Sequence, residues 1–224
     1  MFFISLYEII KTSLCNALKG ADNCFASLSA SVFGGEVYMK NKIIIVGGYC
    51  ATGKSTFSRK LSRLLNIPCF NKDVIKEILG DGLTAEDNMI DKKGSNTTFM
   101  LMLHIAEQFL ISKKICILES NFKLNESELI KILLEKYDCE CLTFIFKGDL
   151  EVLLKRYTER GKTEGRHWVH STFGENSDSF EKYHLQHGLG EVEIGKTIVT
   201  DTTVFDKVNY EGLYEAAEMF IKKE

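Results

Sequence analysis

Five short apolar runs recur between residues 43 and 200 and are separated by segments of helical periodicity. The runs are Ile43–Val46, Ile67–Phe70, Ile115–Leu118, Cys141–Phe146 and Thr197–Thr200. Helical patterns occupy Thr56–Leu65, Asp73–Leu79, Asn96–Ser112, Glu126–Tyr137, Asp149–Glu159 and Tyr210–Lys222. Strands that alternate with helices predict a parallel sheet with right-handed crossovers. Because the runs are continuously apolar, we expect five strands buried on both faces in a three-layer α/β/α sandwich.

Residues 1–40 differ from the rest of the chain. Apolar residues stand there at helical spacing, which predicts an amphipathic helix, and the small residues of 27–35 predict a linker. A signal peptide is the alternative, but no basic residue precedes the apolar run, and Glu8 and Lys11 interrupt it. Met39 stands where the following domain would begin. We therefore expect 1–40 to be an accessory leader or a misassigned start, ahead of one domain over 41–224.

Composition narrows the class of protein. The 224 residues are 45% hydrophobic and 26% charged, which is ordinary for a globular protein. A net charge of −3 gives no overall attraction to nucleic acid or to an anionic membrane. Seven cysteines without metal-ligand spacing favour a reducing, cytoplasmic setting. No uninterrupted apolar stretch is long enough to span a bilayer, so we expect no membrane partner.

The segment Gly48–Ser55 has the spacing of a phosphate-binding loop, G-x-x-x-x-G-K-[ST], between a strand-like run and a helical segment. Backbone N–H groups of such a loop surround phosphates, and the next helix directs its positive end at them. Lys54 is expected to reach the β- and γ-phosphates as a catalytic group, and the Ser55 hydroxyl to ligate Mg²⁺. The residues predicted to bind the nucleotide are Gly48, Tyr49, Cys50, Ala51, Thr52, Gly53, Lys54, Ser55 and Thr56. A chance glycine-rich turn is the alternative.

Polar residues follow the second apolar run, where ligands of parallel sheets bind. Asp73 is a candidate catalytic base, because a carboxylate there can take the proton of a hydroxyl that attacks the γ-phosphate. The alternative is that Asp73 only caps its helix. Lys76, one turn later, is a candidate for holding an anionic group of the substrate.

The third run ends in Glu119-Ser120-Asn121. An acidic residue at this position is expected to coordinate Mg²⁺ through water, and Glu119 is the candidate. The alternative for Glu119 is a solvated strand end. Asn121 is a weaker candidate for hydrogen bonding to the substrate.

A basic segment follows the fourth run, and we interpret residues 155–190 as an α-helical lid. Arg156 and Arg160 are four residues apart and share a helical face. Guanidinium groups stabilise the charge that phosphoryl transfer spreads over the γ-oxygens, so both are catalytic candidates. Arg166, in the same segment, is a candidate for contacting the substrate. The alternative is a solvated charged helix paired with nearby glutamates.

Two histidine pairs and one threonine complete the candidates. His167-x-x-His170 and His184-x-x-His187 suggest zinc, but no cysteine or carboxylate cluster completes either site. We expect these histidines to position a substrate or to pack in the lid. Thr202 follows the fifth run and is a candidate for contacting the adenine.

Together these motifs resemble a group of kinases with a phosphate-binding loop. The group includes phage polynucleotide kinase, chloramphenicol phosphotransferase, the zeta toxins and AAA-domain ATP-binding kinases. The resemblance covers residues 41–222 and rests on Gly48–Ser55, Asn71–Lys76, Arg156–His170 and Val199–Thr203. It implies a parallel sheet in the order 2-3-1-4-5, Asp73 as the base, and Arg156 or Arg160 on the transferred phosphate. Glu119 replaces the more usual aspartate, and the leader has no counterpart.

The leading hypothesis is an ATP- and Mg²⁺-dependent kinase that phosphorylates a hydroxyl of a small molecule. A 5′-hydroxyl polynucleotide kinase is the second hypothesis, although the composition lacks an extended basic surface. A nucleotide-dependent switch is a third, and Asp91–Gly94 matches its D-x-x-G pattern by letter but follows no strand. An inactive nucleotide-binding module is the last. The oligomeric state cannot be read from the sequence.

Overall fold

The computed structural model describes residues 40–82, 92–163, 167–170 and 176–223. Residues 40–224 form one compact unit. Three predictions fall outside the described residues: the amphipathic helix before residue 40, the D-x-x-G match at Asp91, and the substrate role of Arg166.

The fold is built on a five-stranded parallel sheet. The strands are β1 (Asn41–Gly48), β2 (Cys69–Asn71), β3 (Cys116–Glu119), β4 (Cys139–Lys147) and β5 (Lys196–Asp201). Their spatial order is β2-β3-β1-β4-β5, and all neighbours are parallel. This confirms the predicted α/β class and the order that the resemblance implied.

The prediction that all five strands are buried on both faces was wrong for the two edge strands. β5 has exposed or half-buried positions throughout, with Val199 62% exposed, and β2 is half-buried. Edge strands have a neighbour on one side only, so fewer helices cover them. The expected run at Ile67–Phe70 also starts later, because Ile67 still donates its N–H to Ser62 at the end of the preceding helix and Pro68 has no N–H to donate.

Seven helices and one short 3₁₀ turn lie in the described part of the chain. They are α2 (Lys54–Leu65), α3 (Lys72–Asp81), α4 (Lys92–Ile111), α5 (Leu124–Lys136), α6 (Leu150–Thr163), α7 (Ser177–His187), the 3₁₀ turn Phe205–Lys207, and α8 (Tyr210–Lys222). The sequence pattern did not predict α7 as a separate helix. Asn176 caps it by accepting from the N–H of Ser179, and Gly188 ends it in a left-handed conformation.

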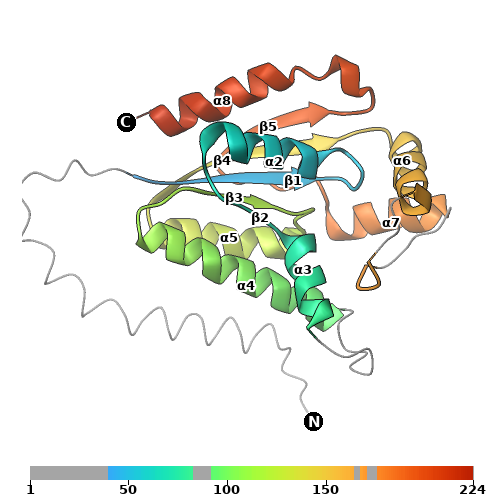
Figure 1. Cartoon of the computed structure of the whole chain (residues 1–224), viewed down its shortest axis with the longest axis horizontal. Coiled ribbons are helices and arrows are strands. Elements are labelled where there is room, and N and C mark those ends of the chain that lie inside the picture. Colours follow the sequence, from blue (N-terminus) through green and yellow to red (C-terminus); the bar gives the residue numbers. More distant parts are fainter. Residues whose placement is uncertain (1–39, 83–91, 164–166, 171–175, 224) are drawn as a thin grey trace, which may run out of the picture. The chain divides into compact units, whose positions relative to one another are not determined.

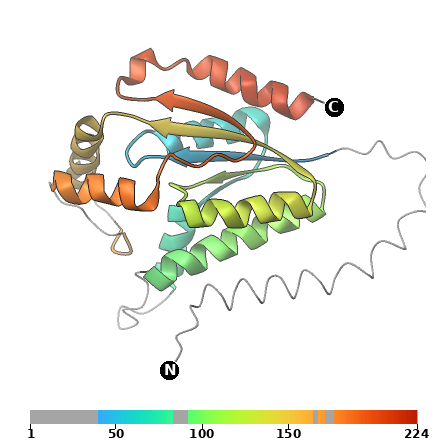
Figure 2. The ribbon, with the colours of Figure 1, turned by 180° about the vertical axis from the view of Figure 1, so that it is seen from behind.

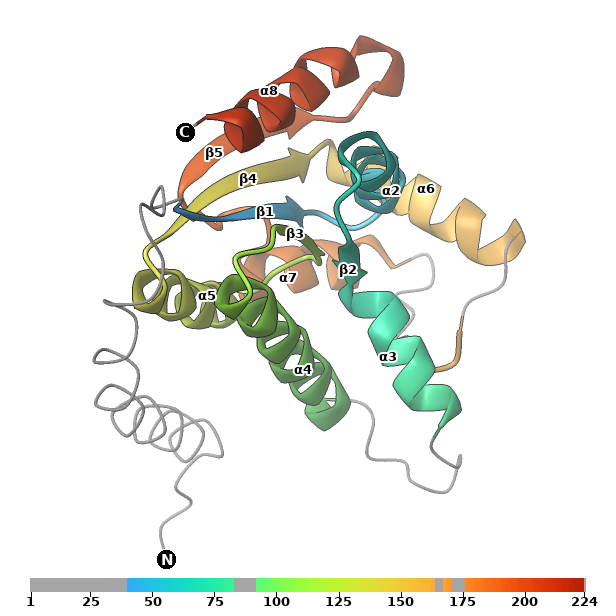
Figure 3. The same ribbon diagram turned by 60° about the vertical axis from the view of Figure 1, so that its left-hand side comes forward.

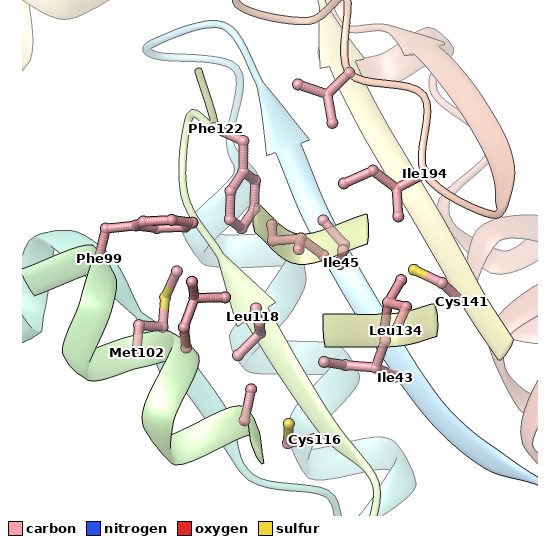
Figure 4. Packing of buried hydrophobic residues seen from close by; sticks show 14 of the residues in the cluster. Ile43, Ile45, Phe99, Met102, Cys116, Leu118, Phe122, Leu134, Cys141 and Ile194 are labelled. Carbon is pink, nitrogen blue, oxygen red and sulfur yellow. The ribbon is translucent and has the colours of Figure 1, made fainter. Parts of the chain in front are cut away.

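Helices cover both faces of the sheet. Figures 1 and 2 show α2 and α8 on one face and α4 and α5 on the other. The side chains of β1 alternate between these layers: Ile44 and Val46 pack with α2 and α8, whereas Ile43 and Ile45 pack with α4 and α5. Figure 4 shows the cluster that contains Ile43 and Ile45, where the ring of Phe99 from α4 points toward Phe122.

The carboxyl ends of the strands face α6 and α7, as Figure 3 shows for β1 and β4. Leu153 and Tyr157 of α6 and Phe180 of α7 form a separate buried cluster. Residues of the loop after β1 pack against that cluster. None of the described helices has the length and apolar character needed to cross a membrane.

Candidate functional site

The loop between β1 and α2 has a backbone that requires its glycines. Gly48 has φ +120°, and a Cβ there would lie 2.0 Å from the carbonyl oxygen of Phe146. Gly53 has φ +84° and begins α2 as its N-cap. A side chain at Gly48 would therefore push β1 away from β4. These constraints leave a loop whose backbone can approach phosphates closely.

Lys54 begins α2 and is 6% exposed. Its ammonium donates to the carbonyl oxygen of Tyr49, within the same loop. The Thr52 hydroxyl donates to that same oxygen at 2.8 Å. Burial lowers the pKa of the Lys54 ammonium, while the negative groups nearby, which include Glu119 and Asp73, act in the opposite direction. Glu119, at the end of β3, and Asp73, in the first turn of α3, therefore belong to the electrostatic surroundings of Lys54.

Two side chains with oxygen atoms suited to Mg²⁺, those of Ser55 and Glu119, lie close to Asn71. Glu119 ends β3 and pairs in register with Asn71 at the end of β2. The Asn71 amide donates to Glu119 Oε2 and, at 3.3 Å, to Ser55 Oγ. Hydroxyl and carboxylate oxygens are ligands that Mg²⁺ prefers, so Ser55 and Glu119 fit this ion.

Glu119 is 4% exposed, so the alternative of a solvated strand end is wrong. Burial raises the pKa of its carboxyl to about 7, and the ammonium of Lys54 partly opposes that rise. A carboxyl with this pKa changes charge near neutrality. A bound cation would favour its ionised form.

Asp73 lies in the first turn of α3, but it is not the helix cap. The cap is Asn71, whose Oδ1 accepts from the N–H of Val74 at 2.9 Å. The alternative that Asp73 only caps the helix is therefore wrong. Asp73 is exposed and borders two cavities of about 120 and 560 Å³, both also lined by His170.

The smaller cavity brings together the residues predicted to contact the substrate. Lys76 and Asn121 line it with Asp73. The Lys76 ammonium donates to the Val169 carbonyl at 2.7 Å, and the Asn121 amide contacts Cys50 Sγ at 3.3 Å. Val169 packs against Gly80 of α3. A Cβ at Gly80 would lie 2.2 Å from Val169 Cγ1, so a larger residue there would clash with Val169.

Arg156 and Arg160, both on α6, lie in different surroundings. Arg156 donates from both terminal nitrogens, at 2.7 Å each, to the carbonyl oxygens of Thr202 and Thr203. Its guanidinium carbon lies 3.8 Å from the centre of the Phe205 ring. Arg160 is close enough to Lys54 to lower the pKa of that lysine, and it lines the larger cavity with Ser55 and Asp73. The structure thus ties Arg156 to the loop after β5 and places Arg160 beside the phosphate-binding loop.

Thr202 is fully buried, and its hydroxyl donates to the Lys147 carbonyl at 2.8 Å. The Thr202 side chain therefore joins the ends of β4 and β5. The backbone carbonyl of Thr202 accepts from Arg156. Because the hydroxyl is buried, the Thr202 side chain presents no exposed polar atom to a nucleobase.

Two groups at the site were not foreseen from the sequence, and a third, His184, was expected only to position a substrate or to pack in the lid. Asn71 was given no role, although its place beside Lys72 and Asp73 was a usable signal. Lys72 and Glu126 form a buried ion pair, with 8% and 4% of their side chains exposed. His184 lies against the phosphate-binding loop, where its Nε2 accepts from the N–H of Cys50 at 3.2 Å. No sequence pattern links residues so far apart in the chain.

Several solved structures share this fold. A candidate kinase from Chloroflexus aurantiacus is 24% identical, with a TM-score of 0.70 over 81% of this chain and 98% of that one. A sugar kinase from Janibacter sp. is 14% identical, with a TM-score of 0.50 over 82% of this chain and 95% of that one. The shikimate kinase of Bacteroides thetaiotaomicron is 13% identical, with a TM-score of 0.50 over 81% and 98%.

No curated protein matches the chain in sequence. A family of AAA domains matches residues 44–181, which hold the phosphate-binding loop, Asp73, Glu119 and both lid arginines. The chain therefore belongs to the AAA domain family.

Proposed function

We propose that this protein is an ATP- and Mg²⁺-dependent kinase that transfers the γ-phosphate to a hydroxyl of a small molecule. One observation carries the proposal. The Asn71 amide joins Glu119, at the end of β3, to Ser55, which follows Lys54 at the start of α2. Asp73, in the first turn of α3, lines a cavity together with Ser55 and Arg160. A cationic phosphate ligand, a metal-binding carboxylate and an exposed carboxylate beside a cavity are the groups that phosphoryl transfer needs.

Each side chain has a separate task in this proposal. Backbone N–H groups of the phosphate-binding loop and the Lys54 ammonium bind the phosphates, and Arg160 stabilises charge on the transferred group. Ser55 and Glu119 hold Mg²⁺, which neutralises phosphate charge when bound. Asp73 takes the proton of the acceptor hydroxyl while the acceptor oxygen bonds to phosphorus and the bond to ADP breaks. Arg156 holds the loop that borders the nucleoside.

The comparisons support a small acceptor. A sugar kinase and a shikimate kinase share the fold, and both are named for small hydroxylated compounds. Asp73 borders cavities of about 120 and 560 Å³, and the larger is within the roughly 300–1,000 Å³ typical of small-molecule sites. A cytoplasmic location stays a prediction and rests on the cysteine content alone.

Calorimetry with Mg·ATP, followed by a phosphotransfer screen, tests the proposal. The screen covers sugars, hydroxy acids, nucleosides and 5′-hydroxyl oligonucleotides. Wild type should bind Mg·ATP and phosphorylate a small acceptor, Lys54→Ala should lose binding, and Asp73→Asn should bind but lose turnover. Absence of binding to wild type would refute nucleotide dependence. Transfer only to oligonucleotides, with affinity that falls steeply with salt, would favour a polynucleotide kinase instead.

A further inference from the structure

Helix α7 places a buried imidazole against the phosphate-binding loop. His184 is 1% exposed, and its Nε2 accepts from the N–H of Cys50 at 3.2 Å. Its other nitrogen, Nδ1, donates to the carbonyl oxygen of Phe180 at 2.6 Å. An imidazole that accepts at one nitrogen and donates at the other is neutral, with its proton on Nδ1. Burial lowers the pKa of His184 and so favours this neutral form.

The peptide group between Tyr49 and Cys50 is hydrogen bonded at both its N–H and its carbonyl. The N–H of Cys50 and the carbonyl of Tyr49 belong to the same peptide group. That carbonyl accepts from the Lys54 ammonium and from the Thr52 hydroxyl, both inside the loop. His184 holds the opposite end of the peptide group from outside the loop, so the group cannot rotate without breaking bonds at both ends.

The ring of His184 also packs against the loop. It meets the Tyr49 ring edge-on, with centres 4.9 Å apart, and lies 4.4 Å from the Phe180 ring. The neighbouring residue of α7, Tyr183, lines the smaller cavity with Cys50 and Asn121, and the Asn121 amide contacts Cys50 Sγ at 3.3 Å. Helix α7 therefore lies beside Cys50 through two successive residues.

We infer that His184 is a positioning residue of the nucleotide site, an inference that rests on the proposed function. Lys54 must leave the Tyr49 carbonyl to reach a phosphate, which removes one of the bonds that hold the Tyr49–Cys50 peptide. His184 then keeps this peptide in place, so the remaining N–H groups of the loop stay aimed at the phosphates. Preorganised donors of this kind bind an anion without first having to be ordered.

The hydrogen bond to His184 also changes the role expected for the backbone N–H of Cys50. Its N–H was expected to contact phosphate with the rest of the loop, but this donor is already committed to His184. Phosphate contacts then fall to the N–H groups that follow it in the loop.

Binding of Mg·ADP to variants of the full chain, measured by calorimetry, tests the inference. His184→Phe keeps an aromatic ring but has no acceptor, and we expect the Kd of Mg·ADP to rise at least fivefold. His184→Gln supplies a carbonyl acceptor and should stay within twofold of wild type. His187→Phe, one turn later on the same helix, is the matched control and should match wild type. Circular dichroism checks that each variant is folded, and His184→Met replaces the Phe variant if that one is not.

Equal affinity of wild type and His184→Phe would overturn the inference. So would a glutamine variant as weak as the phenylalanine one, because ring packing rather than the hydrogen bond would then explain the loss. Failure of wild type itself to bind Mg·ADP would instead overturn the proposed function, and the two failures are therefore distinct.

Discussion

Replacing Glu119 by glutamine should make the protein more stable at alkaline pH while removing a ligand of the proposed Mg²⁺ site. Burial raises the pKa of the Glu119 carboxyl from 4.5 to about 7 in the folded state. The folded state therefore holds this proton more tightly than the unfolded chain does. Stability that is present below pH 4.5 is lost as the pH rises through the folded pKa of about 7. At 1.36 kcal/mol per unit, the loss above that pH is on the order of 3 kcal/mol.

Glutamine is neutral throughout this range, and its carbonyl can still accept from the Asn71 amide. The free energy of unfolding of Glu119→Gln should thus match that of wild type near pH 4.5 and exceed it by about 3 kcal/mol at pH 8. The same variant should lose Mg²⁺-dependent turnover, since a neutral amide is a poor ligand for this ion. Greater stability with less activity is common where a charged group is buried for function.

Urea unfolding followed by circular dichroism, at pH 4.5 and pH 8 and without divalent ions, measures the difference. Glu128→Gln is the control, because it makes the same substitution on the surface of α5, where 62% of the Glu128 side chain is exposed. A difference between Glu119→Gln and wild type that is the same at both pH values would refute the reasoning. A variant less stable than wild type at pH 8 would refute it as well.

Three further predictions concern the arginines, the core and the leader. Arg156→Ala should raise the KM for ATP, whereas Arg160→Ala should lower kcat by about 10³-fold or more, and steady-state kinetics that show the reverse would refute the assignment. Phe144→Ala should lower the free energy of unfolding by about 3–5 kcal/mol in urea titrations, because this ring is fully buried between α2 and α8; a cost below 1 kcal/mol would contradict that packing. A chain without residues 1–38 should bind Mg·ADP like the full chain, since residues 40–224 form one compact unit, and lost binding would show that the leader contributes.

Much of the fold follows from local patterns along the chain. Short runs marked each of the five strands, and the three inner strands β3, β1 and β4 read as apolar because they are buried on both faces. The run at Cys141–Phe146 is the core of β4, and Ile115–Leu118 differs from β3 by one residue at each end. Boundaries shifted where a hydrogen bond or a cap decided them, as Asn71 did at the start of α3.

One part of the candidate site could likewise be predicted from the sequence, and another part could not. The phosphate-binding loop was readable from the sequence because its chemistry depends on neighbours in one short segment, from Gly48 to Ser55. The different contacts of Arg156 and Arg160 could not be predicted from the sequence. Both lie on one helix four residues apart, and only the position of the loop after β5 decides which of them is engaged there.

The sequence alone determined the strands, six of the seven described helices and the phosphate-binding-loop motif, since periodicity and short motifs encode contacts between nearby residues. Tertiary structure decided that Asn71 meets Glu119 and Ser55, that Lys72 pairs with Glu126, and that His184 holds Cys50. These partners are as much as 134 positions apart in the chain. Such pairs leave no periodic signal, because only the packing of the strand ends and of α7 brings them within hydrogen-bonding distance.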